Sequence, residues 1–561
     1  MIAFKPRQTE RAAIANGIKM ERGATTAETF PTVFAQRVAA HPHKPAIVSA
    51  TRSVTYGELN EEATRIAAAL VTAAGLDAEP VALLFDQEIS AFAATIGVLQ
   101  SGKFYVTLDP LYPSARLTEI LTDAEAATLL TSESCVALAQ EICPIGVTII
   151  NVDRLPVNLV PLPPIAIPPD AYAYIGYTSG STGKAKGVIE THRNHLCHWQ
   201  NLMRAQPDYG NERVLFLNRL SFSGGQLAFY LTFLAGATLY LYDLQSNGVA
   251  ALPEWIQRHQ LTVWNSVPTV FRAFVAQVTA PQQVASIRLL RLASDTILAQ
   301  DIEAYRRLFA PTCQLWFCYA LTEAKTVTMA FLDRNAVLNP TAIPSGQPIN
   351  GMEIRIVDEA GRRLGPNQVG EILVRSRYVS PGYWGNATMT AERFQPDRDA
   401  AGVYLLRTGD LGTVDDEGCL YHKGRKDTQV KIRGYRVELS EVEAHLAALD
   451  GVQEVAVRLY KADEGQERLA AYLICSDTPP PSSSQLRRQL EERLPAYMIP
   501  NSFTFLERMP VNRNGKIDRA ALPIPTPNRP ALDRPLTAAR TPLEETLVAI
   551  WQEVLRVKPI G

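Results

Sequence analysis

The segment from Tyr177 to Gly187 combines side chains and backbone positions that suit phosphate binding. It contains three glycines, four Ser or Thr hydroxyls and two lysines. Glycines let a backbone approach an anion closely and point its N–H groups inward, while hydroxyl and ammonium groups add donors and charge. The spacing differs from a Walker A loop, which requires Gly at the position of Thr178. We therefore predict a phosphate-binding loop of another type.

Alternating helical and β patterns surround this loop. Apolar spacing predicts amphipathic or buried helices over residues 56–73 and 89–100, and buried strands over 81–85 and 127–131. Such alternation is typical of α/β proteins with parallel sheets, which hold loops at the carboxyl ends of their strands. The fold class that we expect is therefore α/β.

The charge balance argues against a polyanionic partner. The 561 residues include 55 Lys and Arg against 57 Asp and Glu, a formal net charge of −2. The chain has seven cysteines with no CxxC pair, which is typical of a reducing compartment. Residues 220–242 carry no charge, but polar residues and Gly236 divide them into parts too short to span a membrane. We expect a cytoplasmic protein with neither a nucleic-acid nor a membrane partner.

Prolines mark the connections between folded parts. Five prolines fall within residues 157–169, and another proline-rich run follows Leu522. Proline disrupts helices and central strands, so the second run reads as a linker. At its end, Thr541 followed by Pro542 and two Glu residues is a strong helix start, and the helix should run to about Leu555.

Several further motifs occur in a fixed order along the chain. They are Val54-Thr55-Tyr56-Gly57-Glu58-Leu59, residues 102–110 with Tyr112-Pro113, Tyr319-Ala320-Leu321-Thr322-Glu323, Gly370-Glu371-Ile372, Gly382-Tyr383-Trp384, Arg407-Thr408-Gly409-Asp410-Leu411, Gly424-Arg425-Lys426-Asp427, residues 431–438 and Asn514-Gly515-Lys516-Ile517-Asp518-Arg519. With the phosphate loop, this set resembles the adenylate-forming enzymes, most closely the adenylation domains of non-ribosomal peptide synthetases, over residues 30–522.

The resemblance implies a two-part architecture. Residues 1–426 would form a large core of packed mixed sheets and helices, and residues 427–522 a small, mobile α+β lid domain that swings about the hinge residue Asp427. Residues 523–540 would be the proline-rich linker. Residues 541–561 would be the truncated start of a carrier domain, because 21 residues cannot build a core of their own.

The resemblance also implies the chemistry. An acid carboxylate would attack the α-phosphorus of ATP, pyrophosphate would leave, and the acyl group would pass to the phosphopantetheine thiol of a carrier protein, whose attachment serine is not in this chain. The implied catalytic residues are Lys516, Thr182 and Glu323, with Glu323 as the Mg²⁺ ligand. The implied ATP-binding residues are Thr178, Ser179, Gly180, Ser181, Thr182, Gly183, Lys184, Tyr319, Thr322, Asp410, Arg425 and Lys516.

The substrate pocket departs from the family pattern. Ungapped counting places Ser223 where members that activate α-amino acids have an Asp that pairs with the ammonium group. A hydroxyl cannot neutralise a buried ammonium, so we expect an α-keto, α-hydroxy, aryl or short acyl acid. Arg291 should face an acceptor on the substrate or on Asp295, unless it turns outward at a strand end. The implied pocket residues are Ser223, Gly224, Leu227, Asn265, Arg291, Ala293, Cys318, Thr326 and Val327.

Three interpretations of the function remain open from the sequence. Because the resemblance begins near residue 30, we expect a starter module of a non-ribosomal peptide or hybrid synthetase. The alternative is an acyl-CoA ligase, or an adenylation domain for an amino acid bound in an atypical way. A non-catalytic scaffold is disfavoured because Thr182, Glu323, Asp410 and Lys516 are all present.

Overall fold

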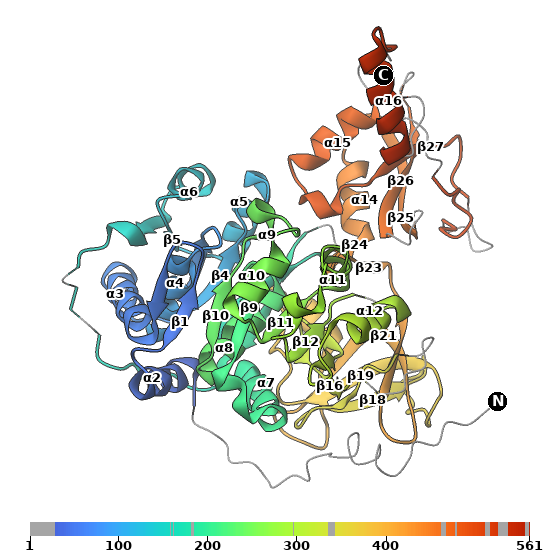
Figure 1. Cartoon of the computed structure of the whole chain (residues 1–561). Helices are drawn as coiled ribbons and strands as arrows, with labels where there is room; N and C mark the ends of the chain where they lie inside the picture. The colour runs from blue at the N-terminus through green and yellow to red at the C-terminus, as the bar shows by residue number, and fades with distance from the viewer. Residues whose placement is uncertain are drawn as a thin grey trace.

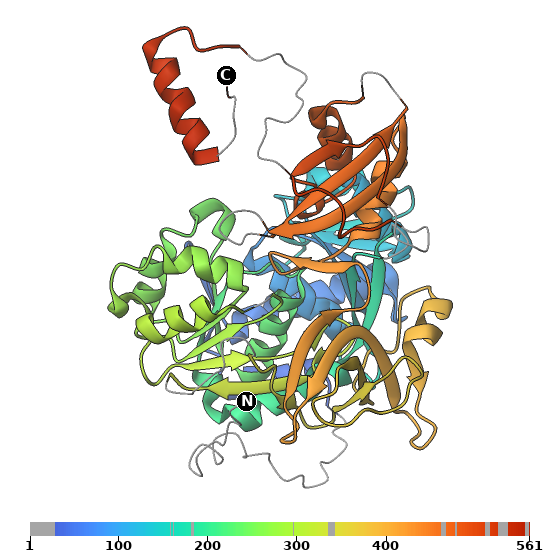
Figure 2. The ribbon, with the colours of Figure 1, turned by 90° about the vertical axis from the view of Figure 1, so that its right-hand side faces the viewer.

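The computed structural model describes residues 28–157, 159–160, 162–180, 184–295, 297–334, 343–461, 467–476, 480–510, 517–525, 537–555 and 560. Within these residues, three sheets and their helices build a large N-terminal part (Figure 1). A smaller part, which we call the C-terminal unit, follows residue 428 and stands on one side of it (Figure 2).

A six-stranded sheet carries the phosphate loop. Its order is β6-β5-β3-β4-β7-β8, parallel except for the final β7–β8 pair. Helices α3 and α4 pack on one face, and α5 and α6 on the other. The strands are β3 (Pro80–Leu84), β4 (Phe104–Leu108), β5 (Thr128–Thr131), β6 (Thr148–Asn151), β7 (Tyr172–Thr178) and β8 (Lys186–Thr191). The helices are α3 (Tyr56–Ala74), α4 (Ile89–Gln100), α5 (Ser114–Asp123) and α6 (Val136–Ile142).

A nine-stranded sheet, ordered β17-β16-β13-β12-β11-β9-β10-β1-β2, carries most of the pocket positions. Helix α8 packs on one face and α10, α11 and α12 on the other. The strands are β1 (Pro45–Val48), β2 (Ser53–Thr55), β9 (Arg213–Phe216), β10 (Thr238–Leu241), β11 (Val263–Ser266), β12 (Leu289–Leu292), β13 (Gln314–Phe317), β16 (Thr328–Leu332) and β17 (Gln347–Pro348). The helices are α7 (His192–Ala205), α8 (Ser223–Ala235), α9 (Leu244–Asn247), α10 (Leu252–His259), α11 (Pro268–Val275) and α12 (Ala299–Leu308).

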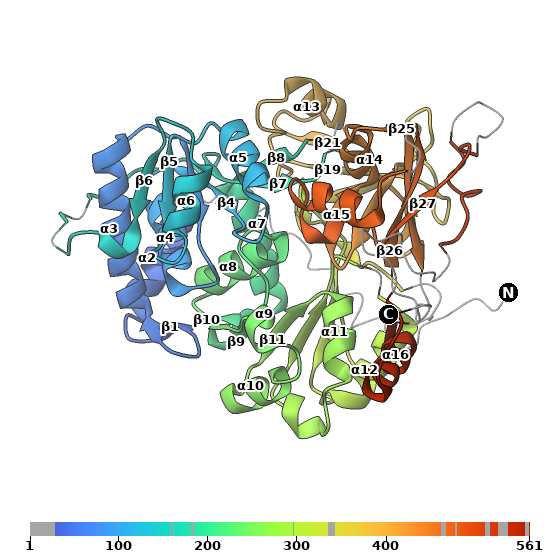
Figure 3. The same cartoon turned by 90° about the horizontal axis from the view of Figure 1, so that it is seen from above.

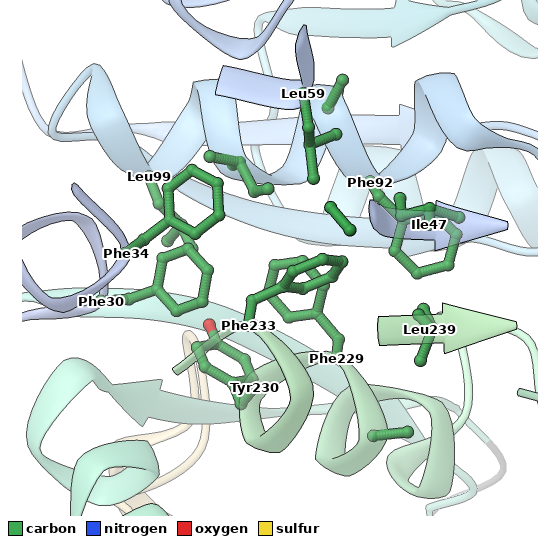
Figure 4. Packing of buried hydrophobic residues seen from close by; sticks show 14 of the residues in the cluster. Phe30, Phe34, Ile47, Leu59, Phe92, Leu99, Phe229, Tyr230, Phe233 and Leu239 are labelled. Atoms are coloured by element: carbon green, nitrogen blue, oxygen red, sulfur yellow. The ribbon is translucent and has the colours of Figure 1, made fainter. Parts of the chain in front are cut away.

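An aromatic core joins these two sheets (Figure 4). Phe30 of α2 (Phe30–Ala40) stacks on Phe229 of α8, with ring centroids 5.2 Å apart. Phe92 of α4 meets Phe233 of α8 edge to face at 6.2 Å. All four rings are buried, so helices from three separate segments lock the sheets together.

A five-stranded antiparallel sheet completes the N-terminal part. Its strands are β18 (Glu353–Val357), β19 (Gly370–Ser376), β20 (Phe394–Pro396), β21 (Tyr404–Val414) and β22 (Leu420–Arg425), with α13 (Ala387–Arg393) before β20. A short hairpin, β14 (Ala320–Leu321) and β15 (Lys325–Thr326), lies between β13 and β16 in the chain.

The C-terminal unit begins with a hairpin and continues as a three-stranded sheet covered by two helices, seen from above in Figure 3. Its elements are β23 (Gln429–Ile432), β24 (Tyr435–Glu438), α14 (Leu439–Ala447), β25 (Val452–Lys461), β26 (Glu467–Cys475), α15 (Ser483–Glu491) and β27 (Ser502–Phe505). Helix α16 (Pro542–Leu555) follows, and Thr541 Oγ1 accepts a hydrogen bond from Glu544 N at 3.2 Å, the predicted cap.

The sequence expectations are confirmed for the elements and the fold class. Helix α4 has the predicted bounds, α3 and β5 differ by one residue at one end, and β3 differs by one residue at each end. The uncharged stretch 220–242 folds mainly as α8 and β10, and none of the helices that the structure describes is long and apolar enough to cross a membrane. The boundaries 426/427, 522/523 and 540/541 stay predictions; the first falls between β22 and β23.

Candidate active site

The phosphate loop connects β7 to β8, the two strands labelled near the middle of Figure 3. A Cβ atom built on Gly180 would lie 2.0 Å from the carbonyl oxygen of Lys184, so only glycine fits this turn. Thr178 Oγ1 is buried and has no hydrogen-bond partner among the described residues, which leaves a donor for a ligand, and Lys184 is exposed. The other predicted loop residues, Ser181, Thr182 and Gly183, lie outside the described residues.

The β23–β24 hairpin of the C-terminal unit lies against this loop. Ser179 Oγ donates to the carbonyl oxygen of Arg436 at 2.8 Å and accepts from Glu438 N at 3.2 Å. Gly180 N donates to Glu441 Oε2 at 3.0 Å. Arg116 of α5, a helix that packs on the six-stranded sheet, donates to the other oxygen of Glu441 at 2.6 Å. Two donors of the phosphate loop therefore contact the C-terminal unit.

Glu323 sits in the turn between β14 and β15 and is 5% exposed. Arg436 Nη1 donates to both of its oxygens, at 2.8 and 2.9 Å, and Tyr383 Oη donates to Oε1 at 2.9 Å. Burial acts to raise the pKa of Glu323, but the charges of Arg436 and Lys186 outweigh it and hold that pKa well below its usual range. An ionised, buried carboxylate fits the hard oxygen ligand that Mg²⁺ prefers.

Lys186, the first residue of β8, is the nearby ammonium. Its side chain is 8% exposed, and its nitrogen lies 5.2 Å from the centre of the Tyr383 ring. Burial is the main cause that lowers the pKa of Lys186 to about 8, and the charge of Arg436 adds to it. A bound phosphate would favour the charged form of this lysine.

A second group of predicted residues comes together around Asp410, on β21 of the antiparallel sheet. Tyr319 Oη donates to Asp410 Oδ2 at 2.5 Å, Arg425 Nη1 donates to Asp410 Oδ1, and His422 Nε2 lies 3.4 Å from the same oxygen. Burial opposes ionisation, yet His422, Arg425 and Tyr319 together lower the pKa of Asp410 to about 2. Arg425 also donates twice to Asp427, at 2.7 Å in each case, which ties the predicted hinge to this group.

This group suits a nucleoside. Tyr319 presents a buried ring 6.0 Å from the ring of His422, a flat environment for a base, and an ionised Asp410 can accept from a ribose diol. Thr322 lies half-buried beside Glu323 in the turn between β14 and β15. Lys516 lies outside the described residues.

Most of the predicted pocket residues lie on or directly after strands of the nine-stranded sheet or at the start of α8, which covers one face of that sheet. Asn265 and Arg291 are paired neighbours on β11 and β12. Ala293 and Cys318 follow β12 and β13, Thr326 ends β15 with Val327 next to it, and Ser223, Gly224 and Leu227 lie in the first turns of α8. Ser223 is exposed, whereas Arg291 is only 6% exposed. The expectation that Arg291 turns outward at a strand end is therefore wrong.

Three residues of the site had no role assigned from the sequence. Arg436 stood only within the motif 431–438, Tyr383 only within the motif 382–384, and Lys186 only within the phosphate loop. A cation in the motif 431–438 was a usable signal, but its partner Glu323 is 113 residues away, beyond any local pattern.

Comparisons with known proteins agree with this geometry. The AMP-binding enzyme family model matches residues 34–384, and the model of the AMP-binding enzyme C-terminal domain matches residues 441–516. Bacitracin synthase 3 of Bacillus licheniformis is 32% identical over 549 residues, covering 95% of this chain and 8% of that protein. Surfactin synthase subunit 3 of Bacillus subtilis (strain 168) is 30% identical over 558 residues, 98% of this chain and 43% of that protein. The chain thus spans less than half the length of these relatives.

Solved structures share the fold. The o-succinylbenzoate CoA synthetase of Bacillus subtilis aligns with a TM-score of 0.76 and 25% identity over 87% of this chain and 97% of that one. An NRPS protein containing adenylation and PCP domains aligns with a TM-score of 0.77 and 24% identity over 95% of this chain and 88% of that one. Because the family model covers more than half of the residues, the chain belongs to the AMP-binding enzyme family, and it is an ATP-dependent acid ligase that forms acyl-AMP with ATP and Mg²⁺ as cofactors.

Proposed function

We propose that this chain is a starter module that activates a carboxylic acid and passes it to the phosphopantetheine thiol of a carrier protein in a non-ribosomal peptide or hybrid synthetase. The observation that carries the proposal is the contact of Arg436 and Glu438 with Glu323 and Ser179, which brings the C-terminal unit onto the nucleotide side of the core. Residues 1–426 would act as the core, 427–522 as the lid, 523–540 as the linker and 541–561 as part of the carrier.

In the first step, the described residues hold the reactants in line. Asp410 and Tyr319 would hold the nucleoside, while Thr178 and Lys186 would donate to the phosphates. Glu323 would hold Mg²⁺, which supplies positive charge to the phosphate oxygens when bound. Lys516 would reach both the acid carboxylate and the α-phosphate, so that charge developing there is neutralised while pyrophosphate leaves.

In the second step, the β23–β24 hairpin would replace Lys516 at the site by rotation about Asp427. The contacts of Arg436 and Glu441 with the nucleotide side of the core are those expected of this thioester-forming arrangement. The thiol would then attack the acyl carbon, forming the thioester and releasing AMP.

A carrier partner would also account for α16. Leu543, Leu547, Ile550 and Trp551 of this helix are all exposed, and their i, i+4, i+7 and i+8 spacing places them on one face of the helix. The remainder of a carrier domain would cover these side chains. The relatives named above are bacitracin and surfactin synthases, and one structural neighbour contains adenylation and PCP domains.

The substrate would lack an α-ammonium group, because Ser223 stands at the first turn of α8 where a carboxylate would be needed. The alternative functions are an acyl-CoA ligase, favoured by the likeness to o-succinylbenzoate CoA synthetase, and an adenylation domain for an amino acid bound in an atypical way. Comparing coenzyme A with a holo-carrier protein as the acceptor distinguishes an acyl-CoA ligase from the proposed starter module. Testing the twenty proteinogenic amino acids as substrates distinguishes an amino-acid-activating domain from it.

The experiment is ATP–pyrophosphate exchange with the full chain, with and without Mg²⁺ and with each acid in turn. We expect acid- and Mg²⁺-dependent exchange that Lys516→Ala nearly abolishes. Lys461→Ala, which alters an exposed lysine at the end of β25, is the matched control and should retain exchange. Undiminished exchange in Lys516→Ala would remove our role for Lys516, and strong preference for a common L-amino acid would overturn the substrate inference.

A further inference from the structure

Asn265, Arg291 and Trp316 form a row across three neighbouring strands, β11, β12 and β13. Asn265 is paired with Arg291, and Arg291 with Trp316, in parallel register. Paired residues of a parallel sheet point to the same face. Leu289, two positions before Arg291, packs in the same cluster as α8, whereas Leu290 belongs to the cluster on the opposite face. The row therefore faces α8 and the predicted substrate pocket.

Arg291 is a buried cation whose described neighbours do not neutralise it. Its Nη2 donates to the Cys318 sulfur at 3.1 Å, and its guanidinium lies 5.0 Å from the centre of the Trp316 ring. Within the described part of the chain, its Nε has no hydrogen-bond partner. Among the residues that the structure describes, no carboxylate forms an ion pair with Arg291. A thiol and an aromatic ring compensate a buried charge only in part.

The surroundings of Arg291 hold further polar atoms that lack partners. Asn265 is 3% exposed and its side chain lies beside the buried Tyr209 hydroxyl, but among the described residues neither its amide nitrogen nor its amide oxygen has a hydrogen-bond partner of good geometry. His198 of α7 is 4% exposed, and both of its ring nitrogens lack partners. Burial is the main cause that lowers the pKa of His198 to about 3, and the charges of Lys325 and Arg291 add to it, so the ring is neutral. Buried polar groups are normally hydrogen-bonded, so this cluster has the composition of a ligand site.

The charge of the pocket is the reverse of one built for an α-amino acid. Ser223, at the N-terminal end of α8, supplies no negative charge, and Arg291, on the sheet that α8 covers, supplies a positive charge. A guanidinium presents parallel N–H donors that match a carboxylate. An anionic group on the substrate would satisfy Arg291 Nε and accept from the Asn265 amide.

We propose that the acid activated by this chain is a dicarboxylic acid without an α-ammonium group, whose second carboxylate binds Arg291 and Asn265. This inference rests on the proposed function and names the substrate class of the same site. The reacting carboxyl points toward Glu323, and the second carboxyl lies at the row on β11 to β13.

The first test uses the unaltered chain and matched pairs of acids in ATP–pyrophosphate exchange. The pairs are glutarate with monomethyl glutarate, glutarate with pentanoate, and 2-oxoglutarate with 2-oxopentanoate, and L-glutamate and benzoate complete the panel. We expect kcat/KM for each dicarboxylate to exceed that of its partner by about 10- to 100-fold, as hydrogen bonds to a charged group predict. Equal or better exchange with the monocarboxylates would overturn the proposal.

The second test assigns the preference to Arg291. Arg291→Met should lower kcat/KM for dicarboxylates by about 10- to 100-fold while monocarboxylates change little, and Arg291→Lys should keep part of the preference. Arg213→Met is the matched control, because Arg213 also stacks on a ring of this sheet, at 5.2 Å from the centre of Tyr240, but is exposed at the start of β9. An unchanged preference in Arg291→Met would overturn the proposal.

Failure of the proposed adenylation function would give a different result from failure of the dicarboxylate proposal. Exchange with monocarboxylates alone would reject the dicarboxylate and leave the activation chemistry in place. Exchange with none of the acids, under conditions where the chain is folded, would reject both. Should Arg291→Met fail to fold, the glutarate and monomethyl glutarate pair still decides, because it changes only the charge of the substrate.

Discussion

Arg436 Nη1 lies 2.8 Å from Oε1 and 2.9 Å from Oε2 of Glu323, so one guanidinium nitrogen of the C-terminal unit binds both oxygens of a carboxylate in the core. Glu323 is also the residue that fits magnesium. In the proposed function, Arg436 of the hairpin and Mg²⁺ would compete for the same carboxylate, which would couple loss of Mg²⁺ and pyrophosphate to docking of the hairpin.

The first prediction concerns this contact. In Arg436→Met the hairpin loses its charged hydrogen bonds, so transfer to a holo-carrier should fall by about 10- to 100-fold relative to ATP–pyrophosphate exchange. Both rates are measured on one preparation, by exchange and by single-turnover loading. Arg433→Met is the control, because Arg433 is exposed on the same hairpin. Equal loss of both rates would show that Arg436 does not act on the second step.

The second prediction uses the close approach of Gly434 to Val267. Gly434 has φ +83°, and a Cβ atom there would lie 2.5 Å from Val267 Cγ1. Gly434→Val should therefore block hairpin docking and thioester formation while exchange persists, as measured by the two assays above. Gly418→Val has nearly the same φ, +82°, with nothing within 4 Å of the added Cβ, and controls for backbone strain. Equal transfer in the two variants would contradict the prediction.

The third prediction concerns nucleotide affinity. Asp410→Asn keeps the shape of the side chain but removes the charge that Tyr319 and Arg425 stabilise. We expect KM for ATP to rise by about 10- to 100-fold, because a charged hydrogen-bond acceptor is lost. Asp399→Asn, an exposed position in a turn, should leave KM unchanged. An unaltered KM in Asp410→Asn would remove Asp410 from the ATP site.

The fourth prediction concerns acid stability. His192 accepts a hydrogen bond at Nδ1 from Phe30 N, 3.3 Å away, and burial lowers the pKa of His192 to about 4. Between pH 4 and the unfolded pKa near 6.5, the unfolded chain binds more protons, so the free energy of unfolding falls as pH falls through this window. His192 should contribute a slope of up to about 1.4 kcal/mol per pH unit.

Urea unfolding between pH 4.5 and 7.5 measures this slope. His192→Gln should reduce it by up to one proton, and His43→Gln, at an exposed histidine, should not. A slope in His192→Gln that equals that of the unaltered chain would show that the proton is taken up elsewhere.

Some of the site could be predicted because the relevant residues lie in contiguous motifs. Tyr319, Glu323 and Asp410 each stood in a short run of residues whose chemistry suits a nucleotide, and the structure brings Tyr319 and Asp410, 91 residues apart, into contact. The orientation of Arg291 could not be predicted. Strand β12 reads Leu-Leu-Arg-Leu and is buried on both faces, so it has no alternating pattern that assigns a face to the arginine.

The sequence by itself determined the fold class, the family and the chemistry, since hydrophobic periodicity and ordered motifs are local properties of the chain. Only the tertiary structure decided that Arg436 binds Glu323, that Gly434 meets Val267, and that Arg291 is buried without a described carboxylate partner. The physical reason is that these contacts join residues far apart in the sequence, so they depend on how sheets and helices pack. Whether a buried charge such as that of Arg291 has a partner depends on that packing as well.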